Sequence, residues 1–271
     1  MQLSVKEIQQ FQQKIFTWYE QNQRDLPWRK SRDPYRILIS EVMLQQTQVS
    51  RVIPKYEAWL KVFPNVDALA KATVTDVLRM WSGLGYNRRA LNLQKAAKVV
   101  VEEFSGIFPK DIQSLKKLPG IGTYTAAAVV CFAYDLQVPV IDTNIRKVIA
   151  VEFFKGELPQ EKVIEVVALK LLPTGRAYEW NQALMDYSSL VLRDKKIPIP
   201  KQSHFRSSNR YYRGRTIALL LEIQSISFSG LWSYFEEHNP IEKDRLEEIV
   251  HSMVKDGLLK VDTDHISLSE L

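Results

Sequence analysis

Apolar residues recur at helical spacing through most of the first 190 residues. In residues 5–22, for example, Ile8, Phe11, Ile15, Trp18 and Tyr19 fall on one face of a helix. Because proline and glycine separate such segments, the ends of each one can be placed. The pattern predicts a mostly α-helical fold, with further helices at 36–47, 50–62, 75–81, 88–104, 111–117, 123–134, 143–152, 160–172 and 178–192.

The pattern changes after residue 196. The sequence IPIPKQ at 197–202 cannot continue a helix, since proline lacks a backbone donor and restricts the residue before it. Helical spacing returns at 209–223, 230–238 and 241–256, and residues 257–268 alternate on either side of a polar turn, as a hairpin does. We therefore predict a helical domain at 1–196, a linker at 197–208 and a small winged-helix-like module at 209–271.

The composition is that of a globular chain, with 45% of its 271 residues hydrophobic. The longest apolar run, residues 126–134, is too short to span a bilayer, and the first residues lack the basic and apolar regions of a signal peptide. The one cysteine, Cys131, cannot form a disulfide within the chain, which fits a reducing compartment. We expect a cytoplasmic monomer with no membrane partner.

Basic residues concentrate in one segment. The net charge of the chain is +6, and residues 193–215 alone carry eight basic side chains against one acid. Aromatic and imidazole rings lie among these charges, which suits contact with a DNA backbone. A solvated linker kept extended by its charges is the alternative. DNA contact is the favoured interpretation, with Arg206, Arg210, Arg213 and Arg215 as candidate residues.

Glu41 and Asp142 are each the only acid in an apolar run. Burial among Ile, Val, Met and Leu would raise the pKa of Glu41 and let it carry a proton near neutral pH, as a general acid must. Asp142 precedes a predicted helix, whose free N–H groups favour an ionised carboxylate facing a developing cation. Two carboxyl groups in such different environments suit cleavage of a glycosidic bond. Asp142 as an ordinary N-cap and Glu41 as the partner of a buried arginine remain alternatives.

Between the two acids lies LPGIGTYT at 118–125. Gly120 and Gly122 allow a tight turn, and the helix that begins at Thr123 offers free N–H groups to a phosphate. A single pair of glycines is weak evidence by itself, because many turns between helices contain one. Its position about twenty residues before Asp142 strengthens the prediction of a phosphate-binding turn.

Five segments in a fixed order resemble the helix-hairpin-helix DNA glycosylases and, among these, the MutY-type adenine glycosylases. They are LPWR at 26–29, SEVMLQQTQV at 40–49, WSGLGY at 81–86, LPGIG at 118–122 and IDTN at 141–144. The resemblance covers roughly residues 8 to 190. It implies a two-lobed helical glycosylase fold, with the helix-hairpin-helix near 111–134, followed here by the winged-helix-like module.

The resemblance implies a role for each matched residue. Glu41 corresponds to the acid that protonates the purine, and Asp142 to the carboxylate that stabilises, or transiently bonds, the oxocarbenium-like sugar, with Asn144 beside it. Tyr124 stands where related bifunctional lyases have a Schiff-base lysine, so base excision without efficient strand cleavage is expected. The resemblance also implies a base pocket formed by Arg24, Trp28, Arg29, Leu44 and Gln182.

Gln46 and Tyr86 correspond to residues that enter the DNA stack beside the lesion pair, where a wedge offsets part of the unstacking free energy. From the sequence without the resemblance, Tyr86 would be a core aromatic beside Trp81. The other candidate DNA contacts in the matched segments and beside them are Thr47, Arg88, Gly120, Gly122 and Thr123.

The chain departs from the family in two places. Relatives carry four cysteines after the catalytic domain that ligate an iron-sulfur cluster, whereas Leu192, Ile199, Gln202 and Ser208 stand near those positions here. With one cysteine in the whole chain, no cluster is expected, nor any other cofactor or metal. The C-terminal module is also smaller than the β-rich lesion-sensing domain of adenine glycosylases, which leaves the sensing of 8-oxoguanine open.

We therefore expect a monofunctional glycosylase that releases adenine mispaired with 8-oxoguanine or guanine in double-stranded DNA. A mismatch thymine or uracil glycosylase on the same scaffold is the first alternative. Because purine protonation needs an acid, Glu41 favours adenine. A non-catalytic DNA-binding module is the second alternative, and the intact pair of acids argues against it.

Overall fold

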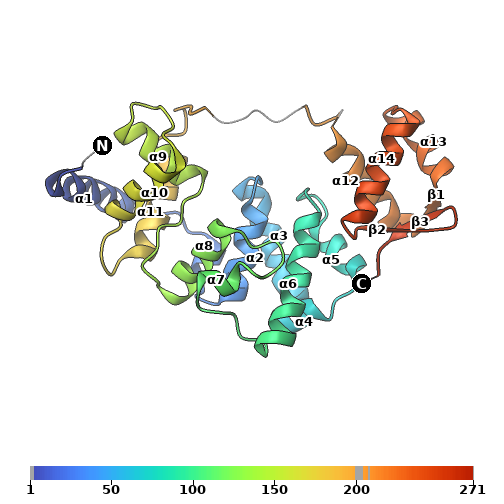
Figure 1. The fold of residues 1–271 in the computed structure, drawn as a ribbon, viewed down its shortest axis with the longest axis horizontal. Coiled ribbons are helices and arrows are strands. Elements are labelled where there is room, and N and C mark those ends of the chain that lie inside the picture. The colour runs from blue at the N-terminus through green and yellow to red at the C-terminus, as the bar shows by residue number, and fades with distance from the viewer. Residues whose placement is uncertain (1–2, 199–203, 207, 271) are drawn as a thin grey trace. The chain divides into compact units, whose positions relative to one another are not determined.

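The structure of the protein, a computed structural model, describes residues 3–198, 204–206 and 208–270. The chain forms two compact units, each assembled from separate stretches of sequence (Figure 1). Unit 1 comprises Met1–Glu41, Phe108–Lys117 and Ile121–Lys201, and unit 2 comprises Val42–Ile107, Leu118–Gly120 and Gln202–Leu271. Within the described residues, no helix has the length and hydropathy needed to cross a membrane.

Unit 1 joins the first helices of the chain to its middle ones. Helix α11 packs against α1, α8 and α9, and Trp180 of α11 lies beside Phe11 and Phe16 of α1, with ring centroids 5.8 and 5.4 Å away. Its helices are α1 (Val5–Asn22), the 3-10 helix η1 (Pro27–Lys30), the first part of α2 (Pro34–Leu44), α7 (Ile112–Leu115), α8 (Thr123–Tyr134), α9 (Thr143–Phe153), α10 (Glu161–Leu171) and α11 (Ala177–Leu190).

Helix α8 explains the longest apolar run of the sequence. Every residue from Thr125 to Phe132 is buried, so the helix has no polar face to turn to solvent. Cys131 lies in this run as a buried thiol whose pKa burial raises to about 12. It therefore behaves as a small apolar residue, as the sequence indicates.

Unit 2 begins with four helices around aromatic side chains. They are α3 (Val49–Val62), α4 (Val66–Ala70), α5 (Val74–Trp81) and α6 (Arg88–Phe104). Helix α6 packs against α4 and α5, and α3 packs against α5. The rings of Trp59 and Trp81 meet edge to face, with their centroids 5.6 Å apart, at the centre of this group.

The C-terminal part of unit 2 combines three helices with a small sheet. Its elements are α12 (Asn209–Ile223), β1 (Ser225–Ser227), α13 (Phe228–His238), α14 (Lys243–Lys255), β2 (Leu259–Asp262) and β3 (His265–Leu268). The strands form an antiparallel sheet in the order β1-β3-β2, in which Ile266 pairs with Ile226 on one side and Val261 on the other. Helix α12 packs against α14, β3 and, within the same unit, α5. We refer to residues 209–270 as the C-terminal module.

Each predicted helix has a counterpart in the structure, but one predicted helix end was wrong and one strand was not predicted. The helix predicted at 36–47 ends at Leu44, because the following backbone turns into the left-handed region at Gln46, with φ of +54°. The predicted hairpin is the β2-β3 pair, and it gains a third strand, β1. Three residues are too few to show alternation in the sequence, so β1 is specified by its pairing with β3.

Candidate active site

Glu41 is a buried carboxyl group on α2, among the buried side chains of Leu38, Ile39, Val42 and Met43. Burial raises the pKa of Glu41 to about 7, although a hydrogen bond from Tyr124 and the charge of Arg29 act in the opposite direction. The donor is the hydroxyl of Tyr124, the second residue of α8, and the acceptor is Glu41 Oε2. An acid with this pKa is half protonated at neutral pH, as a general acid requires.

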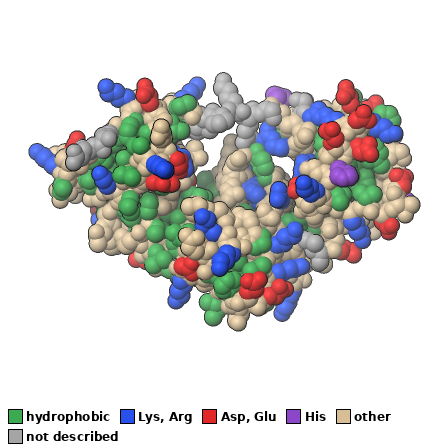
Figure 2. All heavy atoms as spheres, in the orientation of Figure 1, with side chains coloured by type: hydrophobic (Ala, Val, Ile, Leu, Met, Phe, Trp, Pro, Cys, Tyr) green, Lys and Arg blue, Asp and Glu red, His purple; other side chains and the backbone are tan. Residues whose placement is uncertain are grey.

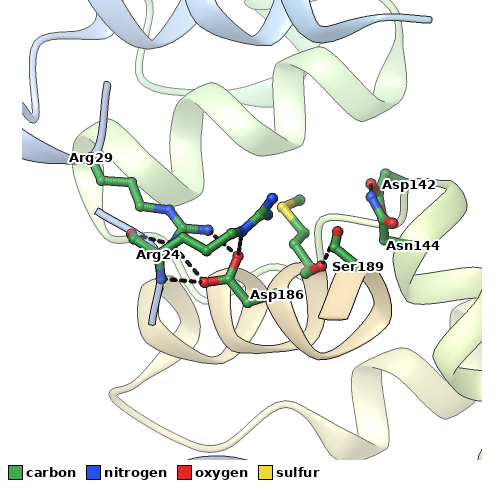
Figure 3. A network of polar contacts seen from close by, with 7 residues as sticks. Arg24, Arg29, Asp142, Asn144, Asp186 and Ser189 are labelled. Carbon is green, nitrogen blue, oxygen red and sulfur yellow. Dashed lines mark hydrogen bonds and ion pairs between the residues drawn. The ribbon is translucent and has the colours of Figure 1, made fainter. Parts of the chain in front are cut away.

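Asp142 lies near Glu41, since its charge contributes to the raised pKa of Glu41. It is the N-cap of α9: Asp142 Oδ1 accepts from the backbone N–H of Ile145 at 2.8 Å, and Oδ2 accepts from Asn144 Nδ2 at 2.7 Å (Figure 3). These bonds favour the anion, as expected at a helix N-terminus. Burial acts more strongly in the other direction and raises the pKa of Asp142 above its usual value, which the sequence did not indicate.

Asn181 forms hydrogen bonds with the extended segment that leads into Asp142, residues 138–140. It is buried on α11, where its Oδ1 accepts from the backbone N–H of Val140 at 2.8 Å and its Nδ2 donates to the carbonyl of Val138 at 3.2 Å. The side chain thus takes the place of a neighbouring strand for residues 138–140. Asn181 gives no signal in the sequence, because its partners are 41 and 43 positions away along the chain.

Asp186, on the same helix, forms ion pairs with two arginines (Figure 3). Arg29 donates to both of its carboxylate oxygens, at 2.7 and 2.8 Å, and Arg24 donates through Nε at 2.6 Å and through its backbone N–H at 2.9 Å. Asp186 is fully buried, and burial alone would raise its pKa, yet the bonds and charge of Arg29 lower it. Both arginines were predicted pocket residues, whereas the carboxylate that fixes them was not predicted.

The other predicted pocket residues lie on the same elements. Trp28, in η1, and Gln182, on α11, are buried, and Leu44, the last residue of α2, is partly buried. Arg29 Nε is buried with no hydrogen-bond partner among the described residues. A buried N–H donor of this kind is available to a polar ligand.

The predicted wedge residues, Gln46 and Tyr86, lie in two turns of unit 2, and both are exposed with positive φ, at +54° and +50°. Arg89 connects these turns: its guanidinium donates to the carbonyls of Val42, Met43 and Gln45 in one and of Leu84 and Gly85 in the other, at 2.6 to 3.3 Å. Arg89 also reaches Thr47 Oγ1 at 3.4 Å. These bonds satisfy the carbonyls at the end of α2 and explain why that helix stops before Gln46.

Arg88, and not its neighbour Arg89, was the predicted DNA contact, and the two side chains differ in burial and partners. Burial lowers the pKa of Arg89 to about 10, whereas Arg88 is exposed and forms an ion pair with Asp256 at 3.2 Å. Two adjacent arginines at a helix start give no local signal of which one is partly buried. The contacts of Arg89 with the turn after α2 join residues 42 to 47 positions apart in the sequence, so only the folded structure reveals them.

The predicted phosphate-binding turn has the required backbone form. Gly120 has φ of +77°, and a Cβ there would lie 2.6 Å from the Cβ of Asn92, so no other residue fits. Gly122 is the N-cap of α8, and both Gly122 and Thr123 are exposed. The free N–H groups at the start of α8 therefore face solvent, where a phosphate could bind them.

The predicted arginine arm contains mostly side chains that have protein partners. Arg206 is exposed, Arg210 donates to the hydroxyl of Tyr86 at 2.8 Å, and Arg213 forms an ion pair with Asp256 at 2.5 Å. Arg215 donates to the hydroxyl of Tyr234. Of the four positions near the family's cysteines, Leu192 packs into the core of unit 1, Ser208 donates to the carbonyl of Phe205, and Ile199 and Gln202 lie outside the described residues.

Residues 39–174 match the family model of the HhH-GPD superfamily base excision DNA repair proteins. The adenine DNA glycosylase of Mycolicibacterium smegmatis is 41% identical over 209 residues, which cover 75% of this chain and 71% of the relative. The rat adenine DNA glycosylase is 36% identical over 232 residues, 79% of this chain and 45% of the relative. The chain belongs to the HhH-GPD superfamily. The predicted relationship to the adenine DNA glycosylases is confirmed, although the chain spans about half the length or less of several of these relatives.

Solved structures give the same result for the fold. A thermostable thymine-DNA glycosylase is 30% identical, with a TM-score of 0.62, and the match covers 68% of this chain and 87% of that one. Endonuclease III, in a complex with DNA, superposes with a TM-score of 0.60 at 19% identity and so supports the fold alone. The predicted fold class, a mostly helical helix-hairpin-helix glycosylase, is confirmed.

The raised pKa values predict how this HhH-GPD protein responds to pH. If protonated Glu41 and ionised Asp142 are both required, the single-turnover rate falls as pH rises through about 7 and falls again in acid, as Asp142 takes up a proton. Because the hydrogen bond from Tyr124 lowers the pKa of Glu41, Tyr124→Phe should move the alkaline limb to higher pH. Single-turnover rates measured from about pH 5 to about pH 9 test this, and an alkaline limb that Tyr124→Phe does not move would exclude Glu41 as the titrating group.

Proposed function

We propose that the protein hydrolyses the N-glycosidic bond of adenine mispaired with 8-oxoguanine or guanine in double-stranded DNA. The observation that carries the proposal is the buried Glu41, with its pKa of about 7, beside Asp142. An acid that holds a proton at neutral pH can protonate a purine ring nitrogen and improve the leaving group. Asp142, held at the start of α9, can then face the positive charge that develops on the sugar.

The fixed arginines support a pocket for a base. Asp186 forms ion pairs with both Arg24 and Arg29 and leaves the Arg29 Nε–H unpaired among the described residues. This N–H can donate a hydrogen bond to a ring nitrogen or carbonyl of a base without a further change of structure. Because the side chains are already fixed by bonds between helices, little conformational entropy is lost on binding.

A thymine or uracil mismatch glycosylase is the competing function, supported by the similarity to the thermostable thymine-DNA glycosylase. A pyrimidine base leaves as an anion stabilised at its carbonyl oxygens, so it needs a protonated Glu41 less than adenine does. Single-turnover excision from duplexes that contain A, T or U opposite G or 8-oxoguanine separates the two. Adenine release from A·8-oxoguanine and A·G is expected, and release of T or U alone would contradict the proposal.

The proposed enzyme is monofunctional. The hydroxyl of Tyr124 donates to Glu41, and a phenol cannot form a Schiff base with the sugar. We expect an abasic product that breaks only after later heat or alkali treatment. Denaturing gels of the reaction, with and without alkali, measure this, and a borohydride-trapped covalent adduct through any lysine would contradict it.

We further propose that no iron-sulfur cluster is present. A cluster needs four ligands, usually thiolates, whereas the single cysteine of the chain is buried in α8 with its pKa raised to about 12. The residues present therefore do not fit the group. The purified protein should be colourless and keep its folded circular dichroism in chelator, and several equivalents of iron by metal analysis would contradict this proposal.

In this proposal the partner is mismatched duplex DNA, and the protein acts as a monomer in the cytoplasm. The exposed start of α8 and the turns that carry Gln46 and Tyr86 offer contacts to the DNA backbone and the base stack. Thr47 and Arg88, which lie next to these turns in the sequence, and the exposed Arg206 remain candidate contacts.

A further inference from the structure

The C-terminal module contributes a side chain to the turn that carries Tyr86. The turn contains Gly83 and Gly85, with φ of +89° and +72°, and Tyr86 itself at +50°. A non-glycine residue adopts this backbone only when other contacts impose it. The result is an exposed aromatic residue, Tyr86, 38% accessible, two positions before the start of α6.

Two guanidinium groups flank the ring of Tyr86. Arg89, whose bonds to the carbonyls of Leu84 and Gly85 fix the turn, has its guanidinium 5.6 Å from the ring centroid. Arg210, in the first turn of α12, has its guanidinium 5.7 Å from the same centroid, and its Nη1 donates to the Tyr86 hydroxyl at 2.8 Å. Arg89 thus bonds to the backbone of the turn, and Arg210, a residue of the C-terminal module, bonds to the hydroxyl at the end of the Tyr86 ring.

A second contact joins the C-terminal module to the start of α6, close to Tyr86 in the sequence. Asp256, just after α14, forms ion pairs with Arg213 of α12 at 2.5 Å and with Arg88 at the start of α6 at 3.2 Å. Asp256 therefore joins the two module helices to the residue that lies two positions after Tyr86. The contact between Arg210 and Tyr86 is consequently one part of a docked surface, together with the packing of α12 on α5.

The charge of the module argues against groove binding as its role. Residues 209–271 carry seven basic and eleven acidic side chains, a net charge of −4. The acidic side chains gather over α13 and α14 (Figure 2), and Asp244, Glu247 and Glu248 lie on α14, the third helix, which a winged helix would place in the major groove. A surface with this sign repels phosphates.

We propose that Arg210 is a positioning residue for Tyr86, through which the C-terminal module sets how well the protein discriminates mispaired from paired duplexes. This inference rests on the proposed function, in which Tyr86 inserts beside the target base pair. With Arg210 bonded to its hydroxyl and Arg89 beside it, the ring enters the base stack in one orientation. It therefore offsets the free energy of unstacking only at a base pair that opens to accept that orientation. Without Arg210, the backbone of the turn stays fixed by Arg89, but the side chain of Tyr86 is free to change its orientation.

A double-mutant cycle tests whether Arg210 acts through the Tyr86 hydroxyl. Tyr86→Phe removes the hydroxyl and keeps the ring, Arg210→Gln removes the donor, and the double variant removes both. Lys260→Gln, on β2, is the matched control: it removes one positive charge from an exposed site of the same module whose ion pair, with Glu270, is long at 3.9 Å. Thermal unfolding of each variant checks that the fold is retained.

The readouts are the excision rate and the affinity for A·8-oxoguanine, A·G and paired A·T duplexes. We expect each single variant to reduce discrimination between the mispaired duplexes and A·T by about 5- to 10-fold, the double variant to match the singles, and Lys260→Gln to leave it unchanged. Additive losses would overturn the proposal. So would an equal loss of affinity for every duplex with a salt slope shallower by about 0.9, since that marks Arg210 as a phosphate contact. If the wild type excises no adenine, the proposed function fails, while the affinities still decide the role of Arg210.

Discussion

Glu41→Gln and Asp142→Asn are each expected to remove nearly all base release while leaving binding to a mispaired duplex little changed. Glu41→Gln keeps the shape of the side chain and its place as acceptor for Tyr124, but cannot deliver a proton. General acid catalysis contributes about 100- to 10,000-fold, so a single-turnover rate lower by at least about 100-fold is predicted. Asp142→Asn removes the negative charge that faces the sugar, and a comparable loss is expected from preorganised electrostatics.

The Asp142 experiment has a built-in control for structure. Asn caps a helix as well as Asp does, so Asp142→Asn should leave α9 intact. Asp111 is the N-cap of α7, where its side chain accepts from the backbone N–H of Ser114 at 2.8 Å. Asp111→Asn makes the same chemical change at the same helix position away from the carboxyl pair. Excision by Asp142→Asn at the rate of Asp111→Asn would show that the charge at 142 has no part in the reaction.

Asp186→Asn is expected to destabilise the protein by about 3 to 5 kcal/mol, because it leaves two arginines with an uncompensated charge in a buried site. The side chain of Asp186 is 0% exposed, against 10% for Arg29 and 25% for Arg24, so solvent screens this cluster little. Urea unfolding monitored by circular dichroism measures the loss. Excision should be lost as well, since the orientation of both guanidinium groups in the proposed base pocket depends on this carboxylate.

Glu179→Gln, on the same helix, provides the comparison. Its ion pair with Arg176 is exposed, with 49% of the Arg176 side chain and 50% of the Glu179 side chain accessible. Exposed pairs of this kind contribute about 0.2 to 1 kcal/mol to the free energy of unfolding. The pH dependence gives a second check. Because the arginines lower the pKa of Asp186, its stabilisation is present above the unfolded pKa, about 3.9, and is lost as the pH falls below it. The difference between wild type and Asp186→Asn should therefore shrink in acid, and a variant as stable as the wild type at neutral pH would contradict the prediction.

The sequence determined the helical fold and most of the chemistry of the proposed site. Spacing of apolar residues located the longer helices, because each one buries a face at a period that a linear pattern records, whereas the short α4 and η1 were not predicted. Glu41 was recognisable as an acid in an apolar helix, and Asp142 as a residue before a helix start, since both signals come from immediate neighbours in the chain. The glycines of the turn at 118–122 were recognisable for the same reason.

Tertiary structure decided the features that depend on distant partners. The end of α2 at Leu44 follows from the bonds of Arg89 to carbonyls more than 40 positions away, and Asp186 meets Arg29 across 157 positions. Asp142 has a raised pKa because desolvation by the folded protein outweighs its helix-cap bonds, a balance that neighbours in sequence cannot report. Local periodicity fixes which face of an element is apolar, but the buried charges and amides that hold the site are fixed by side chains that folding alone brings together.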